Sequence, residues 1–95
     1  AKDGTLWFST LNKGICTLDK NGNTRSYSTS DGLLDNNVWG FLLDSKGRVW
    51  AGGQKGVSLL ENGKITNFTL TMIGARERIT TIEEDRGGKI WFGSN

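Results

Sequence analysis

A short pattern of glycine, two further residues and tryptophan occurs three times in this chain of 95 residues. Its tryptophans, Trp7, Trp50 and Trp91, stand 43 and 41 residues apart. Other positions recur with the same step of 41 residues. They are Val38 and Ile79, Phe41 and Ile82, and Asp44 and Asp85. A fixed period of this length indicates that the chain is built from stacked copies of one supersecondary unit.

The complete unit contains four short apolar runs that are separated by turn residues. The runs cover residues 37–43, 48–52, 57–61 and 64–69, with Gly, Asn and Asp between them. Such residues are typical of tight turns, and no window keeps a helical period over about ten residues. Four strands in about 40–45 residues, with a fixed Trp, is the proportion of a propeller blade. We therefore predict an all-β fold of β-propeller blades, each a four-stranded antiparallel sheet.

The chain holds about 2.3 repeats of 41–43 residues, which correspond to a partial blade, a full blade and a second partial blade. The expected bounds of these blades are 1–29, 37–69 and 78–95. Closed propellers use about four to eight blades, so we expect a partial propeller or a ring that closes by oligomerisation. The implied partners are further blades of the same protein or other copies of the chain. An open two-sheet sandwich is the alternative fold, although it would not require the repeat.

The composition argues against several classes of protein. With 35% hydrophobic and 23% charged residues, the chain is too apolar for a disordered tail and too polar for direct membrane insertion. Its 12 basic and 10 acidic residues lack the basic stripe of a nucleic-acid interface, so no nucleic acid is expected as a partner. The single cysteine, Cys16, lies in an alternating segment where a small buried thiol is expected.

The recurring residues are expected to have structural roles, with the tryptophans packed between blades and the aspartates and glycines shaping turns. They are Trp7, Trp50, Trp91, Asp44, Asp85, Gly47 and Gly88. The absence of histidine excludes histidine triads and histidine metal ligands within these residues. The acidic triplet 83–85 would point to alternate faces of a strand and would not converge on one ion. We therefore expect no catalytic residue, no metal and no cofactor, and predict that the chain is not an enzyme.

The loops that join one blade to the next are the expected ligand site, because loops on a rigid scaffold carry function. In propellers these loops open on one face near the central channel, and here they cover residues 28–37 and 69–78. Their polar groups suit a sugar or an acidic saccharide, and a neighbouring tryptophan is a candidate stacking platform. Packing and simple solvation are the alternative roles. The candidate ligand-binding residues are Asp35, Asn36, Asn37, Trp39, Arg76, Glu77 and Arg78.

Several of these motifs occur together in one known family. They are Asp31-Gly32-Leu33, Asn37-Val38-Trp39, Asp44-Ser45-Lys46-Gly47-Arg48-Val49-Trp50-Ala51-Gly52 and Asp85-Arg86-Gly87-Gly88-Lys89-Ile90-Trp91-Phe92-Gly93. This pattern resembles the two-component regulator propeller repeat. Such repeats form the extracytoplasmic sensor region of bacterial hybrid histidine kinases, many of which respond to oligosaccharides. The resemblance implies a periplasmic or extracytoplasmic sensor in signal transduction that detects oligosaccharides. It carries over no ligand residue, and the segment 72–78 departs from the repeat.

Two other functions remain open at this stage. A protein–protein interaction scaffold, or a self-assembling propeller fragment, would need no small ligand. The Gly-x-Ile/Leu-Trp-Phe pattern is also similar to that of the streptogramin lyase propeller, an enzyme. Its chemistry depends on a histidine base and a metal, and these 95 residues contain no histidine to supply it.

Overall fold

The computed structural model describes residues 4–10 and 14–94. Residues 1–3, 11–13 and 95, which fall within the predicted blades 1–29 and 78–95, lie outside the described residues. The described part contains nine strands and one short 3₁₀ helix, η1 (Thr29–Asp31), and no α-helix. The strands are β1 (Leu6–Thr10), β2 (Gly14–Leu18), β3 (Thr24–Tyr27), β4 (Gly40–Leu43), β5 (Val49–Gly52), β6 (Gly56–Glu61), β7 (Lys64–Thr69), β8 (Ile79–Glu84) and β9 (Ile90–Ser94).

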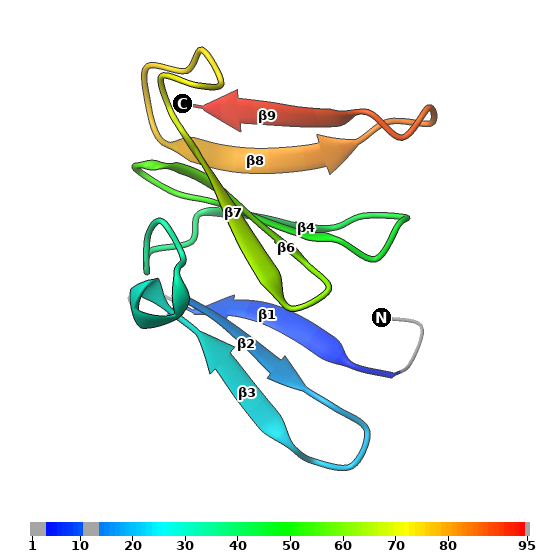
Figure 1. Ribbon diagram of the computed structural model, residues 1–95. Coiled ribbons are helices and arrows are strands. Elements are labelled where there is room, and N and C mark those ends of the chain that lie inside the picture. The colour runs from blue at the N-terminus through cyan, green and yellow to red at the C-terminus, as the bar shows by residue number, and fades with distance from the viewer. Residues whose placement is uncertain (1–3, 11–13, 95) are drawn as a thin grey trace.

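The strands form three meandering sheets, and within each sheet every strand pairs antiparallel with the next one along the chain. Their orders are β1-β2-β3, β4-β5-β6-β7 and β8-β9. Figure 1 shows the sheets stacked in chain order, with β4–β7 between the other two. The predicted all-β fold of antiparallel propeller blades is confirmed, while the exact bounds of the blades stay a prediction.

The middle sheet is apolar on both faces, because alternate residues of a strand point to opposite sides. Val49 and Ala51 of β5 pack toward the first sheet, in a core that includes the fully buried Ile15 of β2. Trp50, between them in sequence, packs toward the third sheet with Ile79 and Ile82. Burying one such aliphatic side chain contributes about 1.5–3 kcal/mol, so these two cores hold the sheets together.

The two outermost sheet faces remain uncovered in the described structure. Leu6 and Phe8 of β1 are 61% and 44% exposed, and Trp91 of β9 is 61% exposed. The packing between blades expected for Trp91 is therefore not found here, because no described sheet lies on that face. Cys16 pairs with Phe8 across β1 and β2 and shares its face, so its thiol is half-buried rather than buried as expected.

Asp44 closes the turn between β4 and β5 with both carboxylate oxygens. Oδ1 accepts hydrogen bonds from the backbone N–H groups of Lys46 and Arg48, at 2.9 and 2.8 Å. Oδ2 accepts from Arg48 Nε at 2.6 Å and from the indole Nε1 of Trp50 at 2.9 Å. Burial of Asp44 alone would raise its pKa, but the bonds from Trp50, Arg48 and Lys46 outweigh it and hold the pKa below its ordinary value.

Asp85 repeats this turn between β8 and β9, but on the surface. Its Oδ1 accepts from the backbone N–H groups of Gly87 and Lys89, each at 2.9 Å, and its Oδ2 accepts from Trp91 Nε1 at 3.0 Å. The indole bond, with the backbone bonds, lowers the pKa of Asp85. The two turns thus share one hydrogen-bond pattern, once buried and once exposed.

Candidate functional site

The first loop between blades, residues 28–37, is fixed by its own short helix. Ser28 caps η1, since its side chain accepts from Ser30 N while the Asp31 side chain accepts from Ser28 N. Gly32 ends η1 with a φ of 110°, a conformation that glycine adopts without strain. Leu33 then enters the core between the first and second sheets. The conformation of this loop is therefore fixed by contacts within the chain and does not depend on a ligand.

Two candidate residues of this loop already have structural partners. Asp35 Oδ1 accepts from Asn37 N at 2.9 Å, and Asp35 Oδ2 accepts from Gln54 N at 3.1 Å. Asn36 Oδ1 accepts from Thr29 N at 2.7 Å. These side chains therefore shape the loop, and a ligand would have to compete with backbone donors for Asp35 and for the Asn36 oxygen.

The second loop, residues 69–78, is held by backbone bonds and by apolar packing. Ala75 N donates to Leu70 O at 2.8 Å, which closes the loop on itself, and Leu70 N donates to Lys55 O at 3.1 Å. Leu70, Ile73 and Ala75 pack against the core between the second and third sheets. The polar residues 76–78 that follow are consequently presented from an anchored segment.

The dipeptide Gly52-Gly53, at the end of β5, accepts hydrogen bonds from residues that follow each of the two loops. Trp39 N donates to Gly52 O at 2.7 Å, and Ile79 N donates to Gly53 O at 3.0 Å. A Cβ on Gly52 would lie 2.6 Å from Ile79 Cγ2, so only glycine permits this close approach. The residues just before β4 and just before β8 are thereby brought to one place, although about 40 residues separate them in sequence.

Trp39 and Arg78 meet at this place. The Arg78 guanidinium carbon lies 4.5 Å from the centre of the Trp39 ring, within the range of a cation–π contact. The Trp39 side chain is nevertheless 44% exposed. Arg78 is half-buried, and its Nε is buried without a hydrogen-bond partner among the described residues. We call this pair the Trp39–Arg78 platform.

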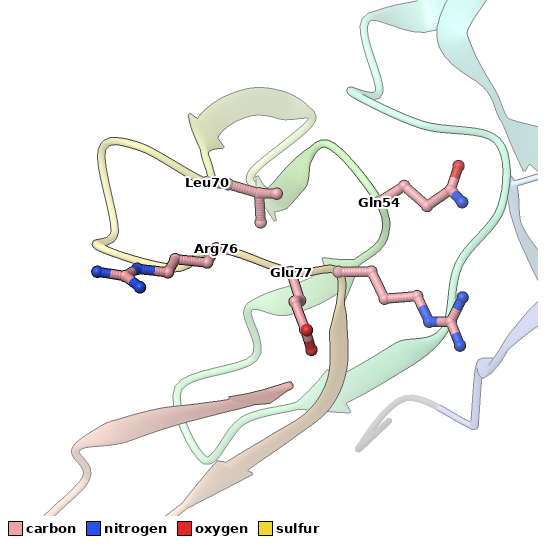
Figure 2. A pocket seen from close by; sticks show the side chains of 5 residues that line it. Gln54, Leu70, Arg76 and Glu77 are labelled. Atoms are coloured by element: carbon pink, nitrogen blue, oxygen red, sulfur yellow. The ribbon is translucent and has the colours of Figure 1, made fainter. Parts of the chain in front are cut away.

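A hollow of about 490 Å³ adjoins the platform. Its lining residues are Gln54, Leu70, Arg76, Glu77 and Arg78. Figure 2 shows Leu70 between Arg76 and Gln54, with the Arg76 side chain extending away from Gln54. The lining therefore combines one apolar side chain with an amide, a carboxylate and two guanidinium groups, which is the kind of mixture that orients a polar ligand.

The two arginines of this hollow form no ion pair within the described structure. The ion pair found among the described residues is Arg48 with Asp44, and neither Arg76 nor Arg78 forms one there. The described residues also contain no group of three His, Cys, Asp or Glu side chains that could hold a metal ion. The arrangement thus offers binding groups, in the form of an aromatic face and hydrogen-bond donors.

The structure brings together some of the candidate residues and separates others. Arg76, Glu77 and Arg78 line the hollow, and Trp39 adjoins it through Arg78. Asn36 is held within its own loop, and Asp35 accepts from Asn37 N in that loop and from Gln54 N beside the hollow. None of Asp35, Asn36 and Asn37 lines the hollow. Gln54 and Leu70 were missed by sequence reasoning. The turn after β5 lies at the same end of the blades as the starts of β4 and β8. The order of the strands therefore contains the signal that Gln54 lies near both loops.

Stacked antiparallel meanders with a tryptophan at one repeated position define the blades of a β-propeller. The family model described as the two-component regulator propeller matches residues 32–55 and 74–95. Two segments of the chain therefore match the two-component regulator propeller family, and the resemblance found in the sequence is confirmed. No curated protein matches the chain. Among the described residues, no helix is long and apolar enough to cross a membrane.

Proposed function

We propose that this chain is a non-catalytic sensor module of a two-component regulator and that it binds an oligosaccharide at the Trp39–Arg78 platform. The observation that carries the proposal is an exposed Trp ring, stacked with a guanidinium group, beside a hollow of about 490 Å³. The module would act outside the cytoplasm, where sensor regions of this family meet their ligands, and signal to an output domain.

A sugar suits this site because it has both apolar C–H faces and many hydroxyl groups. An aromatic ring covers an apolar face of the sugar, and convergent polar side chains fix its orientation. The platform supplies the ring, while Gln54, Glu77 and Arg76 supply donors and acceptors at the hollow. Because both loops are tied to Gly52-Gly53, the groups are held ready before the ligand binds, which reduces the entropic cost of binding.

Replacing Trp39 with alanine is expected to weaken oligosaccharide binding by about tenfold or more, since a buried aromatic contact is typically worth over 1 kcal/mol. The affinity is measured by titration calorimetry against a panel of neutral and acidic oligosaccharides. Trp91→Ala is the matched control, because Trp91 is also exposed but lies on the outer face of β9. An unchanged affinity of a folded Trp39→Ala variant would show that the platform is not the site.

The second candidate function is self-assembly into a protein interaction scaffold. The uncovered faces favour it, because Phe8 lies on the face of β1 turned away from the middle sheet and Trp91 lies on the outward face of β9. Within the chain, the tryptophan-bearing face of one sheet, which corresponds to the face of Trp91, packs against the opposite face of the next sheet, which corresponds to the face of Phe8. Two copies would therefore join head to tail, a contact that closes into a ring if the rotation permits.

Under this second function, light scattering over a concentration series should give one discrete oligomer of a few copies. Phe8→Lys should convert the oligomer to a monomer, because it places a charge in the joined face. Met72→Lys is the control, since Met72 is 66% exposed in the loop before β8 and lies on neither open face. A monomer of the unmodified chain at all concentrations rules out self-assembly.

A further inference from the structure

The Arg78 side chain lacks the partners that a half-buried guanidinium usually has. Its Nε is buried and makes no hydrogen bond among the described residues, and no described carboxylate forms an ion pair with it. An unsatisfied buried donor costs about 1–3 kcal/mol, so native structures seldom keep one without a reason. Arg48 provides the internal comparison, because its guanidinium also lies over a Trp ring but is paired with Asp44.

We infer that the oligosaccharide bound here carries a carboxylate, as uronic acid sugars do, and that Arg78 receives it. This inference rests on the proposed function and narrows the class of sugar. The carboxylate would pair with the terminal NH₂ groups of the Arg78 guanidinium, because its Nε is buried, whereas Asp44 accepts from Nε of Arg48. A guanidinium stacked on an aromatic ring keeps a fixed plane, and its edge matches the two oxygens of a carboxylate.

The charge of the hollow agrees with a ligand that places one carboxylate in it. Arg76 and Arg78 contribute two positive charges to the lining, and Glu77 contributes one negative charge. The lining therefore has an excess of one positive charge, which a single carboxylate neutralises. The whole chain has a net charge of only +2, so this local excess is not a reflection of a generally basic surface.

The test compares acidic oligosaccharides with their carboxyl-reduced counterparts, in which each carboxylate is replaced by a neutral CH₂OH group. Oligomers of galacturonate, of mannuronate and of hyaluronan serve as the acidic probes. At least one of them is expected to bind about tenfold more tightly than its reduced counterpart, and rising salt should reduce this preference. Arg78→Gln should bring the two affinities to within about a factor of two.

Two further variants separate a specific role of Arg78 from general effects. Arg86→Gln removes a positive charge from the exposed turn between β8 and β9, and it should leave the preference for the acidic probe unchanged. Arg78→Lys keeps the charge without the planar fork, and it should retain only part of the preference. Because Arg78 Nε has no hydrogen-bond partner to lose, Arg78→Gln should still fold, which a circular dichroism spectrum matching that of the unmodified chain would show.

The outcomes distinguish this inference from the proposed function. Equal binding of acidic and reduced probes, both abolished by Trp39→Ala, would overturn the carboxylate assignment and leave the oligosaccharide sensor intact. Binding of sulfated oligosaccharides in preference to all uronates would also overturn it. No binding of any acidic or neutral probe would overturn the proposed function and the inference together.

Discussion

Replacing Asp44 with asparagine should lower the free energy of unfolding by about 2–3 kcal/mol, the cost of unpairing buried charge-assisted hydrogen bonds. The carboxylate oxygen Oδ2 of Asp44 accepts from both Arg48 Nε and Trp50 Nε1. In the variant, either this position carries an amide NH₂ group, or the amide turns and presents that group to the backbone donors instead. In either case the N–H groups of the amide would face buried N–H donors, with no acceptor between them. Chemical denaturation followed by tryptophan fluorescence measures the loss.

Asp85→Asn is the matched control, because Asp85 makes the same turn and indole contacts on the surface. Water can replace its partners, so the loss of stability should be much smaller than at Asp44. Equal losses in the two variants would mean that burial contributes nothing to the Asp44 turn.

The same carboxylate makes stability depend on pH. Asp44 has a folded-state pKa below the ordinary value of 3.8, so the unfolded chain takes up its proton first as the pH falls. The contribution of Asp44 is therefore fully present above the ordinary value and is lost as the pH drops through the lower folded value. Asp44→Asn should flatten this part of the stability profile, and an unchanged acid slope would contradict the assigned bonds.

Replacing Gly52 with alanine should also cost about 2–3 kcal/mol, because the added Cβ overpacks the junction between the second and third sheets. It would stand 2.6 Å from Ile79 Cγ2 and 2.9 Å from Ile79 Cβ, and Ile79 is only 1% exposed. Neither strand can yield without losing the bond from Ile79 N to Gly53 O. The loss is measured by chemical denaturation.

Gly87→Ala provides the comparison for Gly52→Ala. A Cβ on Gly87 would meet only Asp85 Oδ1, at an ordinary contact distance of 3.4 Å, and the backbone there does not require glycine. Its stability should be unchanged or slightly higher, since alanine reduces the entropy of the unfolded chain. In a ligand-binding assay, Gly52→Ala should additionally weaken binding. The added Cβ would displace Ile79, and Arg78, which directly precedes Ile79, would move with it. A Gly52→Ala variant as stable as Gly87→Ala would contradict the close approach of these sheets.

Much of the fold could be predicted from local chemistry. The repeated Trp and the Asp-x-x-Gly turns indicate strands and hairpins by themselves, because tight turns need these residue types. The bond from Trp50 Nε1 to Asp44 was not foreseen. Its signal is a spacing of six residues from Asp to Trp in two repeats, at 44 and 50 and again at 85 and 91, whereas Ala1 stands six residues before Trp7.

The candidate site was predicted only in part, since it depends on contacts between distant segments. The loop positions of Arg76, Glu77 and Arg78 follow from the strand pattern, but the contact of Arg78 with Trp39 does not. That contact requires the stacking of the second and third sheets, which no local pattern specifies. Asp35 shows the converse, because a polar loop residue suggested a ligand contact while the structure uses its oxygens for Asn37 and Gln54.

The two faces of each sheet differ in the same sense along the whole chain. The Trp7 ring stacks on Tyr27 and faces the second sheet, just as Trp50 stacks on Phe68 and faces the third. The stack of blades therefore has a direction, because its two ends present different faces. Any unit that keeps a tryptophan on its front face and an apolar back face can be duplicated or removed without altering the contacts of its neighbours. A propeller assembled in this way can change its number of blades through gene duplication, and the loops between blades can diverge independently of that count.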